Sequence, residues 1–224
     1  MSDHSGFSPE WQEIYRKGAH QSVWPWTDLV TLVMRHTPPG RAGLRVLELG
    51  VGAGANVSFF QSLGVDYRGV EGSPTAVDQL RRRFPAISSR FIVGDFTREL
   101  PPGPFDLIVD RGSLTHNSET AIRRSLALIR DSLAPTGHFI GIDWFSSAHS
   151  SATLGKSGED SRTRIDIQNG HLASTGRVHF ADEAHLVDLF RSFVIKFLRH
   201  KVTSTIVPAG AEQLALYDIV CTVR

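Results

Sequence analysis

Short apolar runs alternate with amphipathic stretches along the middle of this 224-residue chain. In several runs the apolar residues are consecutive, as in LIV at 107–109, which is typical of a strand buried on both faces of a parallel sheet. Each run is flanked by residues that favour turns. The pattern predicts strands at 44–50, 67–72, 90–95, 105–110 and 137–144.

The stretches between these runs have the spacing of helices. One predicted helix covers 55–63, and a second begins at Ser73 as N-cap with Pro74 in its first turn. A third, over 118–133, places apolar residues four, three and four positions apart along one face. Strands that alternate with such helices build βαβ units. The chain is therefore predicted to be an α/β protein with a doubly wound, Rossmann-like, mostly parallel sheet and helices on both faces.

The two ends of the chain and one internal segment depart from this plan. A helix at 181–193 and strands at 194–202 and 214–224 are predicted, the strands antiparallel because about eleven residues join them. Residues 1–40 predict two helices broken near Pro25. Residues 145–180 are rich in Ser, Gly, Thr and Asp, and so long a segment is usually functional or mobile. We divide the chain into an N-terminal helical lid, 1–40, and a cofactor-binding domain, 41–224, with an inserted substrate loop at about 145–180.

Composition limits the partners. The 24 Lys and Arg residues nearly balance the 23 Asp and Glu residues, so no basic surplus indicates nucleic acid. Cys221 is the single cysteine, which excludes an internal disulfide, and its apolar surroundings favour a structural thiol. The N-terminus lacks the pattern of a signal peptide, and no apolar run approaches the roughly 20 residues that cross a bilayer. A cytoplasmic protein without a membrane partner is expected; the oligomeric state is not readable.

The segment VLELGVGAGAN, residues 46–56, predicts a turn built for a ligand. Gly50, Gly52 and Gly54 allow a ligand to approach the backbone, and the following helix offers unpaired N–H groups. A dinucleotide fingerprint would need a further glycine at position 55, and the Lys-Ser/Thr pair of a phosphate loop is missing. A cofactor with a diphosphate is therefore disfavoured. A tight turn without a ligand remains the alternative.

Acidic residues end three successive predicted strands. Glu71 stands where a carboxylate accepts hydrogen bonds from ribose hydroxyls. Asp95 with the neighbouring Phe96 offers an acceptor and an aromatic face for adenine, and Asp110 precedes Arg111. Any one of them could be an ordinary solvated strand end. Three at the same edge of one sheet indicate a nucleoside site.

The stretches VLELGVGAG, YRGVEGS, IVGDF, FDLIVDRGSL and GHFIGIDW stand in this order over residues 44–144. In this combination the chain resembles the class I S-adenosylmethionine-dependent methyltransferases. The resemblance implies a seven-stranded sheet whose last strand is antiparallel, S-adenosyl-L-methionine as cofactor, and methyl transfer to a hydroxyl or amine. The residues that it assigns to the cofactor are Glu48, Gly50, Gly52, Gly54, Asn56, Glu71, Gly72, Asp95, Phe96, Asp110 and Arg111.

The acceptor is expected to be a small molecule. The stretch SVWPWTDLV near the N-terminus is similar to segments of bacterial members that act on small molecules or cell-surface sugars. A sugar-derived acceptor is therefore one expectation. Trp24, Trp26, Trp144 and His149 are the candidate substrate contacts; the two N-terminal tryptophans could instead anchor their helix to the core.

Methyl transfer from a sulfonium needs alignment, and a base only where the acceptor carries a proton. His116 and Asp143 are the candidate bases, since His116 lies in the loop after the fourth predicted strand and Asp143 ends the fifth, both at the ligand edge. The alternatives are a helix-capping or exposed His116 and a structural Asp143. We predict no metal, because Trp144 stands where a metal-dependent relative would carry a ligand. The six-residue spacing of His179 and His185 is not a ligand signature either.

Two rival functions stay open at this stage. One is a binding module that keeps the fold and has lost methyl transfer. The other is a nicotinamide-dependent oxidoreductase, which the incomplete glycine fingerprint disfavours.

Overall fold

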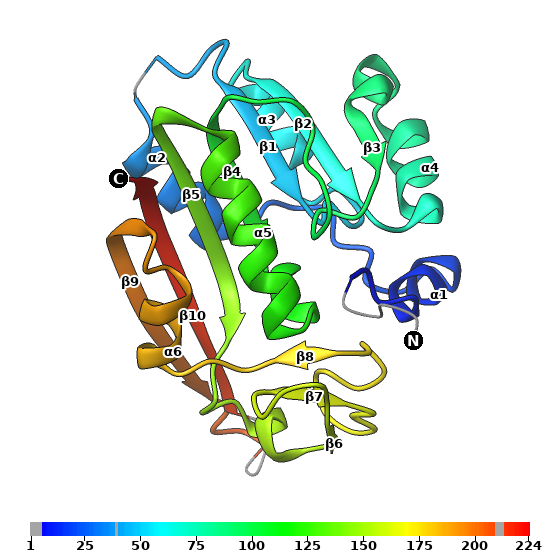
Figure 1. The fold of residues 1–224 in the computed structure, drawn as a ribbon. Helices are drawn as coiled ribbons and strands as arrows, with labels where there is room; N and C mark the ends of the chain where they lie inside the picture. The colour runs from blue at the N-terminus through cyan, green and yellow to red at the C-terminus, as the bar shows by residue number, and fades with distance from the viewer. Residues whose placement is uncertain (1–5, 39, 209–212) are drawn as a thin grey trace.

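A seven-stranded sheet runs through the molecule in the order β3-β2-β1-β4-β5-β10-β9 (Figure 1). The computed structural model describes residues 6–38, 40–208 and 213–224. Strands β1 to β5 are parallel, and β10 is antiparallel to both of its neighbours, β5 and β9. This confirms the predicted fold class. The strands are β1 (Arg45–Leu49), β2 (Asp66–Glu71), β3 (Phe91–Val93), β4 (Phe105–Arg111), β5 (Leu133–Phe145), β9 (Phe193–Ser204) and β10 (Gln213–Val223).

Three of the α-helices described begin at a side-chain cap. The hydroxyl of Ser73 accepts a hydrogen bond from the Ala76 N–H at the start of α4 (Pro74–Arg83), and Ser118 caps α5 (Glu119–Ser132) in the same way. Asp182 caps α6 (Glu183–Leu189), which is shorter than predicted because Phe193 already belongs to β9. The remaining helices are α1 (Glu10–Arg16), α2 (Thr27–His36), α3 (Val57–Ser62) and the 3₁₀ turns η1 (Pro85–Arg90), η2 (Leu114–His116) and η3 (Ser150–Thr153).

Two apolar cores cover the two faces of the sheet. One contains side chains of α5 and α6, such as Ile122 and Leu186, and the other contains side chains of α2, α3 and α4, such as Leu32, Phe60 and Leu80. Each core is therefore a helix layer packed on the sheet, as expected of a doubly wound fold. The ligand edge lies at the carboxyl ends of the parallel strands.

The segment 145–180 folds into a small unit of its own beyond the end of β5 (Figure 1). It contains an antiparallel sheet of β6 (Lys156–Ser157), β7 (Thr163–Ile165) and β8 (Val178–His179). A third apolar cluster, which includes Phe145, Ile167 and Phe180, supports it. Strands of two or three residues are too short to produce a period in the sequence, so the pattern did not predict them.

The predicted N-terminal lid consists of α1, α2 and the connections around them; residues 1–5 and 39 of this segment lie outside the described residues. Helix α1 lies beside α4, where the Gln12 amide donates to the Thr75 hydroxyl at 2.7 Å. Helix α2 packs against the sheet through Leu29, Leu32 and Val33, all buried. Of the helices described, none is long and apolar enough to cross a bilayer.

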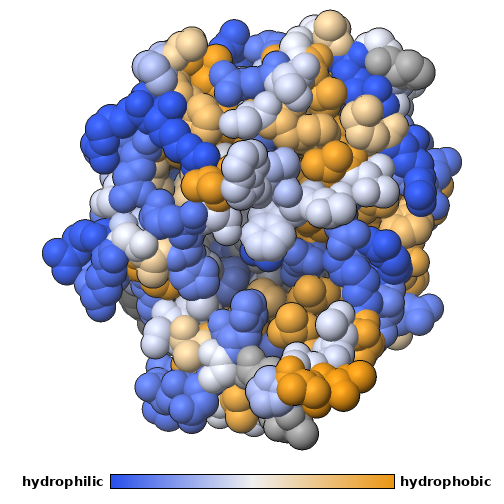
Figure 2. Space-filling model, turned by 180° about the vertical axis from the view of Figure 1, so that it is seen from behind, coloured by the Kyte–Doolittle hydropathy of each residue, from blue (hydrophilic) through white to orange (hydrophobic). Residues whose placement is uncertain are grey.

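The surface mixes residue types. On the face seen in Figure 2, hydrophobic residues form small groups among hydrophilic ones, and a hollow opens near the middle. Large apolar side chains with high exposure include Trp24, Ile206 and Val207, at 81%, 84% and 85%. Scattered exposed apolar side chains are normal for a protein surface and mark no interface by themselves.

Candidate active site

A cavity of about 510 Å³ lies at the carboxyl ends of β1, β2, β4 and β5. Its walls come from the glycine turn, from the ends of β2, β3 and β4, and from residues 7–28 of the N-terminal segment. The inserted segment contributes His149 and His171, and β10 contributes Leu214 and Leu216. The site therefore collects residues from both ends of the chain at the edge of the sheet where open α/β folds bind ligands.

Each glycine of the turn is required for two reasons: its backbone conformation, and a neighbouring side chain that leaves no room for a Cβ. The φ angles of Gly50, Gly52 and Gly54 are +63°, +57° and +85°, which side chains rarely adopt. A Cβ at Gly50 would lie 2.3 Å from the Ser113 Cβ, and one at Gly52 would lie 2.7 Å from the Tyr15 hydroxyl. At Gly54 it would lie 2.6 Å from Cδ2 of Leu80. Glycine is needed at these three positions because side chains from three different elements pack against the turn.

Glu71 ties the end of β2 to the glycine turn. Its side chain is buried, and its Oε2 accepts from the Gly52 N–H at 2.9 Å while Oε1 accepts from the Ser73 N–H at 2.8 Å. Burial raises the pKa of this carboxyl, against the backbone N–H groups that favour its charge. Glu71 lines the cavity, as the sequence predicted. Its contact with a ribose stays a prediction.

Glu48 holds the far side of the same turn. Its Oε1 accepts from Nδ2 of Asn56 at 2.8 Å, and its Oε2 accepts from the Tyr67 hydroxyl at 2.7 Å. Asn56 in turn accepts from the Trp26 N–H at 3.3 Å, which connects the turn to the N-terminal segment. Burial raises the pKa of Glu48 to about 7. Glu48 and Asn56 both line the cavity.

Asp95 and Phe96 form the end of the cavity beyond β3. The Asp95 carboxylate accepts from the backbone N–H and the hydroxyl of Thr97, at 2.9 and 2.6 Å. Phe7, which the sequence did not single out, lies against Gly72: a Cβ there would be 2.1 Å from its ring. The start of the described chain therefore covers the end of the cavity that contains Glu71 and Asp95.

Asp110 and Trp144 do not line the cavity. Asp110 is fully buried; its Oδ1 accepts from the N–H groups of Ser113 and Leu114, both at 3.0 Å, and its Oδ2 accepts from the Trp144 indole at 2.7 Å. The structure therefore does not support the predicted contacts of the Asp110 side chain with the cofactor and of Trp144 with a substrate. Asp110 supplies the acceptor that the buried indole N–H and the backbone N–H groups of the loop after β4 need.

The two N-terminal tryptophans differ. Trp24 is exposed and lies outside the cavity, so the structure does not support it as a substrate contact. Trp26 lines the cavity, with the Arg111 guanidinium carbon 3.7 Å from the centre of its ring. Arg111 also donates from Nε to the Asp143 carboxylate at 3.0 Å. Trp26, Arg111 and Asp143 thus form one connected wall.

Asp143 is held between two cations. It has a φ of +57°, and its Oδ2 pairs with Arg111 while its Oδ1 accepts from the Lys201 ammonium at 2.9 Å. Lys201 also contacts Asp28 at 2.7 Å and Asp218 at 2.9 Å. These three carboxylates have the spacing of a metal site, but the ammonium fills it. Both oxygens of Asp143 are engaged, which suits a structural acid better than a base.

His116 has a fixed tautomer. Its Nδ1 lies 3.0 Å from the backbone oxygen of Arg177, which only accepts, so Nδ1 carries the proton and Nε2 keeps its lone pair. The rings of Trp11 and Phe145 pack edge-on against it. Burial lowers the pKa of His116 to about 4, so the ring is neutral at pH 7. His116 lines the cavity.

His149 lines the cavity from the inserted segment. It is almost fully buried, and its Nδ1 accepts from the Ser151 N–H at 3.0 Å, which caps η3. His20 and His171, which no pattern in the sequence indicated, also line the cavity. Segments far apart in the chain thus supply four imidazoles to one cavity.

Comparisons with known proteins agree with this fold. Residues 46–137 match the methyltransferase domain family. The fold is similar to TehB from Haemophilus influenzae, at 11% identity and a TM-score of 0.65, over 95% of this chain and 67% of that one. It is also similar to the PH0226 protein from Pyrococcus horikoshii, at 20% identity and a TM-score of 0.64, over 97% and 96% of the two chains. A third similar structure is the glycopeptide N-methyltransferase MtfA in complex with sinefungin. It is 18% identical to this chain, with a TM-score of 0.63, over 91% of this chain and 88% of that one. A comparison with curated proteins found no significant match.

Proposed function

We propose that this chain, which carries a class I S-adenosylmethionine-dependent methyltransferase domain, transfers the methyl group to a hydroxyl or amine of a small molecule such as a sugar derivative. One observation supports this acceptor class above all. A neutral imidazole, His116, with its proton fixed on the far nitrogen, lines the same cavity as the glycine turn and Glu71. A hydroxyl or an ammonium must lose a proton during methylation, and such an imidazole can accept it.

The residues around the cavity fit S-adenosyl-L-methionine. A sulfonium supplies an activated methyl group, so the protein has to bind, orient and exclude water. Gly50 and Gly52 of the glycine turn line the cavity, and Asp95 with Phe96 offers an acceptor and an aromatic face. Glu71 adds a carboxylate near the turn. We propose that Glu71 binds the ribose and that Asp95 and Phe96 bind the adenine.

His116 is the better candidate for the base. Asp143 has both oxygens paired with cations, Oδ2 with Arg111 and Oδ1 with Lys201. His116 is neutral and has an unprotonated Nε2. We therefore assign proton removal to His116 and give Asp143 the role of positioning Arg111.

The acceptor is bound, in this proposal, between the N-terminal segment and the inserted segment. Trp26 and Arg111 form one wall of the cavity, and His149 and Phe145 stand on the inserted side. Both segments would act as lids that close the reaction off from water. The cavity volume of about 510 Å³ is within the range of small-molecule sites.

The first test measures cofactor binding. S-Adenosylhomocysteine should raise the melting temperature and bind in calorimetry, while NAD should do neither. Replacing Glu71 by Ala should weaken binding about 10- to 100-fold, since a charged hydrogen-bond acceptor is lost. Glu99→Ala is the matched control, because Glu99 is exposed and lies outside the cavity. Equal affinity of the Glu71 variant and the unaltered protein would refute the ribose assignment.

A further inference from the structure

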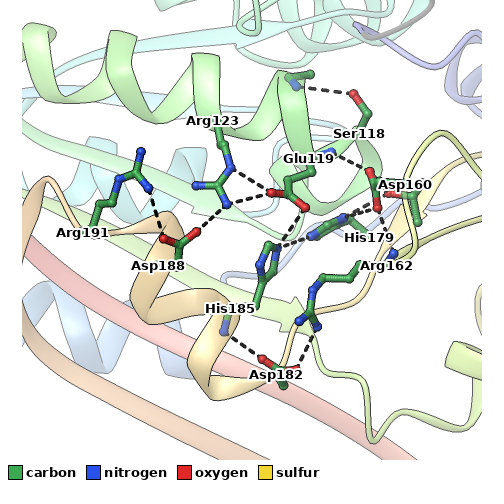
Figure 3. A network of polar contacts seen from close by, with 12 residues as sticks. Ser118, Glu119, Arg123, Asp160, Arg162, His179, Asp182, His185, Asp188 and Arg191 are labelled. Carbon is green, nitrogen blue, oxygen red and sulfur yellow. Dashed lines mark hydrogen bonds and ion pairs between the residues drawn. The ribbon is translucent and has the colours of Figure 1, made fainter.

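A second cluster of titratable side chains lies outside the cavity, where α5, α6 and β8 meet (Figure 3). Glu119 comes from the first turn of α5, His179 from β8 and His185 from α6. One donor atom of each residue lies within 4.8 Å of the other two. Both histidines are buried, and the Glu119 side chain is 28% exposed.

The two imidazoles meet through the same ring nitrogen. Nε2 of His179 lies 2.9 Å from Nε2 of His185. On its other side, Nδ1 of His179 lies 3.0 Å from the Thr163 hydroxyl, whose own proton goes to Asp160 at 2.8 Å. Nδ1 of His179 must therefore be the donor, which leaves the lone pair of Nε2 directed at His185. Either a proton or a cation has to lie between the two nitrogens.

Glu119 is oriented toward the same point. Its Oε1 accepts from Nε and Nη2 of Arg123 at 2.9 and 2.7 Å. Its Oε2 lies 3.8 Å from Nε2 of His185. The Arg123 guanidinium therefore fixes the carboxylate with its other oxygen toward the histidine pair, as Figure 3 shows.

We propose that Glu119, His179 and His185 bind one divalent transition-metal ion, Zn²⁺ being the best match. Two imidazole nitrogens and a carboxylate oxygen are a ligand set that zinc favours. Zinc ligands lie about 2.0–2.2 Å from the ion, so they are about 3–4 Å from one another. The separations of 2.9 and 3.8 Å agree with that geometry.

The surroundings of the cluster resemble the outer shell of a metal site. The Asp160–Thr163–His179 chain and the Arg123–Glu119 pair hold the ligands in place, which is the usual arrangement around bound metal. Asp182 and Arg162 complete the charged neighbours.

The ion would have a structural role. The strand β8 belongs to the inserted segment, while α5 and α6 pack on the main sheet. A shared ion would fasten the inserted segment to the sheet. Helix α5 also follows η2 with His116 after only two residues, Asn117 and Ser118. Binding of the metal would therefore stabilise the loop that carries the proposed base, without touching the reacting atoms.

The test uses the full chain after treatment with a chelator and dialysis. Titration with ZnCl₂ should show binding of about one ion per chain, and the melting temperature should rise by several degrees. Co²⁺ should give visible absorption bands on binding. His185→Gln should lose at least 10-fold in affinity for either ion, whereas His138→Gln, on β5 outside the cluster, should bind as the unaltered chain does.

Glu119→Gln provides a second variant should His185→Gln fail to fold, since its amide oxygen can still accept from Arg123. It should also lose at least 10-fold in Zn²⁺ affinity while it binds S-adenosylhomocysteine as before. No stoichiometric Zn²⁺ or Co²⁺ binding by the unaltered chain would overturn the proposal and leave a hydrogen bond between two histidines. Unchanged affinity in a folded His185 or Glu119 variant would overturn it too. Because these readouts are independent of methyl transfer, they do not depend on the proposed function.

Discussion

Burial decides the behaviour of individual carboxyls and imidazoles in this protein. Glu48 and His116 both line the cavity, yet each prefers its neutral form because the surrounding protein replaces water. Glu48 is held by Asn56 and Tyr67, and His116 by the Arg177 carbonyl. The cavity wall is therefore less charged near neutral pH than its composition indicates.

Glu48 makes stability depend on pH. Its pKa is about 7 in the folded state against an ordinary 4.5, so between these values the unfolded chain has lost a proton that the folded chain retains. The free energy of unfolding should therefore fall as the pH rises from about 4.5 to about 7, by about 3 kcal/mol at 1.36 kcal/mol per pKa unit. Glu48→Gln stays neutral and should lack this fall. Urea unfolding of both proteins at pH 5 and pH 8 measures the difference; parallel profiles would contradict the assignment.

His116→Gln should separate binding from turnover. The glutamine can still donate to the Arg177 carbonyl, but it has no basic nitrogen, so turnover should fall about 10²- to 10⁴-fold once an acceptor is found. The affinity for S-adenosylhomocysteine should not change. Because the pKa of His116 is lowered to about 4, its protonation should reduce the rate only as the pH approaches that value. Full activity of this variant would show that alignment alone is sufficient.

At the scale of elements, the turn between β1 and α3 is packed against residues from several neighbouring elements. Ser113 from the loop after β4, Tyr15 from α1 and Leu80 from α4 each close on one glycine. Glu71 at the end of β2 accepts from the backbone of the same turn. The turn is therefore rigid before any ligand arrives, which reduces the entropy lost on binding.

Gly50→Ala tests this contact. Position 50 has a φ of +63° and an added Cβ would collide with Ser113, so stability should fall by about 2–4 kcal/mol and cofactor binding should be lost. Gly43→Ala is the matched control, because Gly43 has a φ of +81° but no atom within 4 Å of its added Cβ. It should lose only about 1 kcal/mol, from backbone strain, and bind normally. Equal effects in urea unfolding would mean that strain alone, without the collision, accounts for the loss.

At the scale of the whole molecule, one ammonium joins four elements. Lys201 on β9 contacts Asp28 on α2, Asp143 on β5 and Asp218 on β10. Although burial opposes its charge, these carboxylates raise the pKa of Lys201 above its ordinary value. The pair of antiparallel strands and the N-terminal segment are thus fixed to the sheet beside the cavity.

Lys201→Met should destabilise the protein by about 2–4 kcal/mol, because three neighbouring carboxylates would lose the cation that they share. Arg199 would still pair with Asp28 and Asp218, and Arg111 with Asp143. The Lys201 side chain is 21% exposed, which keeps this value below that of a fully buried pair. Lys156→Met, which breaks an exposed pair with Asp166, should change stability by less than about 0.5 kcal/mol. Guanidinium unfolding compares the two. A small loss at Lys201 would indicate that Arg199 and Arg111, and not the ammonium, balance the three carboxylates.

The sequence by itself determined the parallel sheet, the glycine turn and the placement of Glu71 and Asp95 at one edge. Each of these features is encoded within a short segment of the chain, because the spacing of apolar residues along a strand or helix reflects which side chains are buried. Only the tertiary structure decided which of the candidate residues reach the cavity. The side chains of Asp110 and Trp144 point into the protein and hydrogen-bond to each other. Asp143 forms ion pairs with Arg111 and Lys201, which come from distant segments. Phe7, His171 and the meeting of His179 with His185 likewise depend on contacts between segments far apart in the chain, which no local pattern contains.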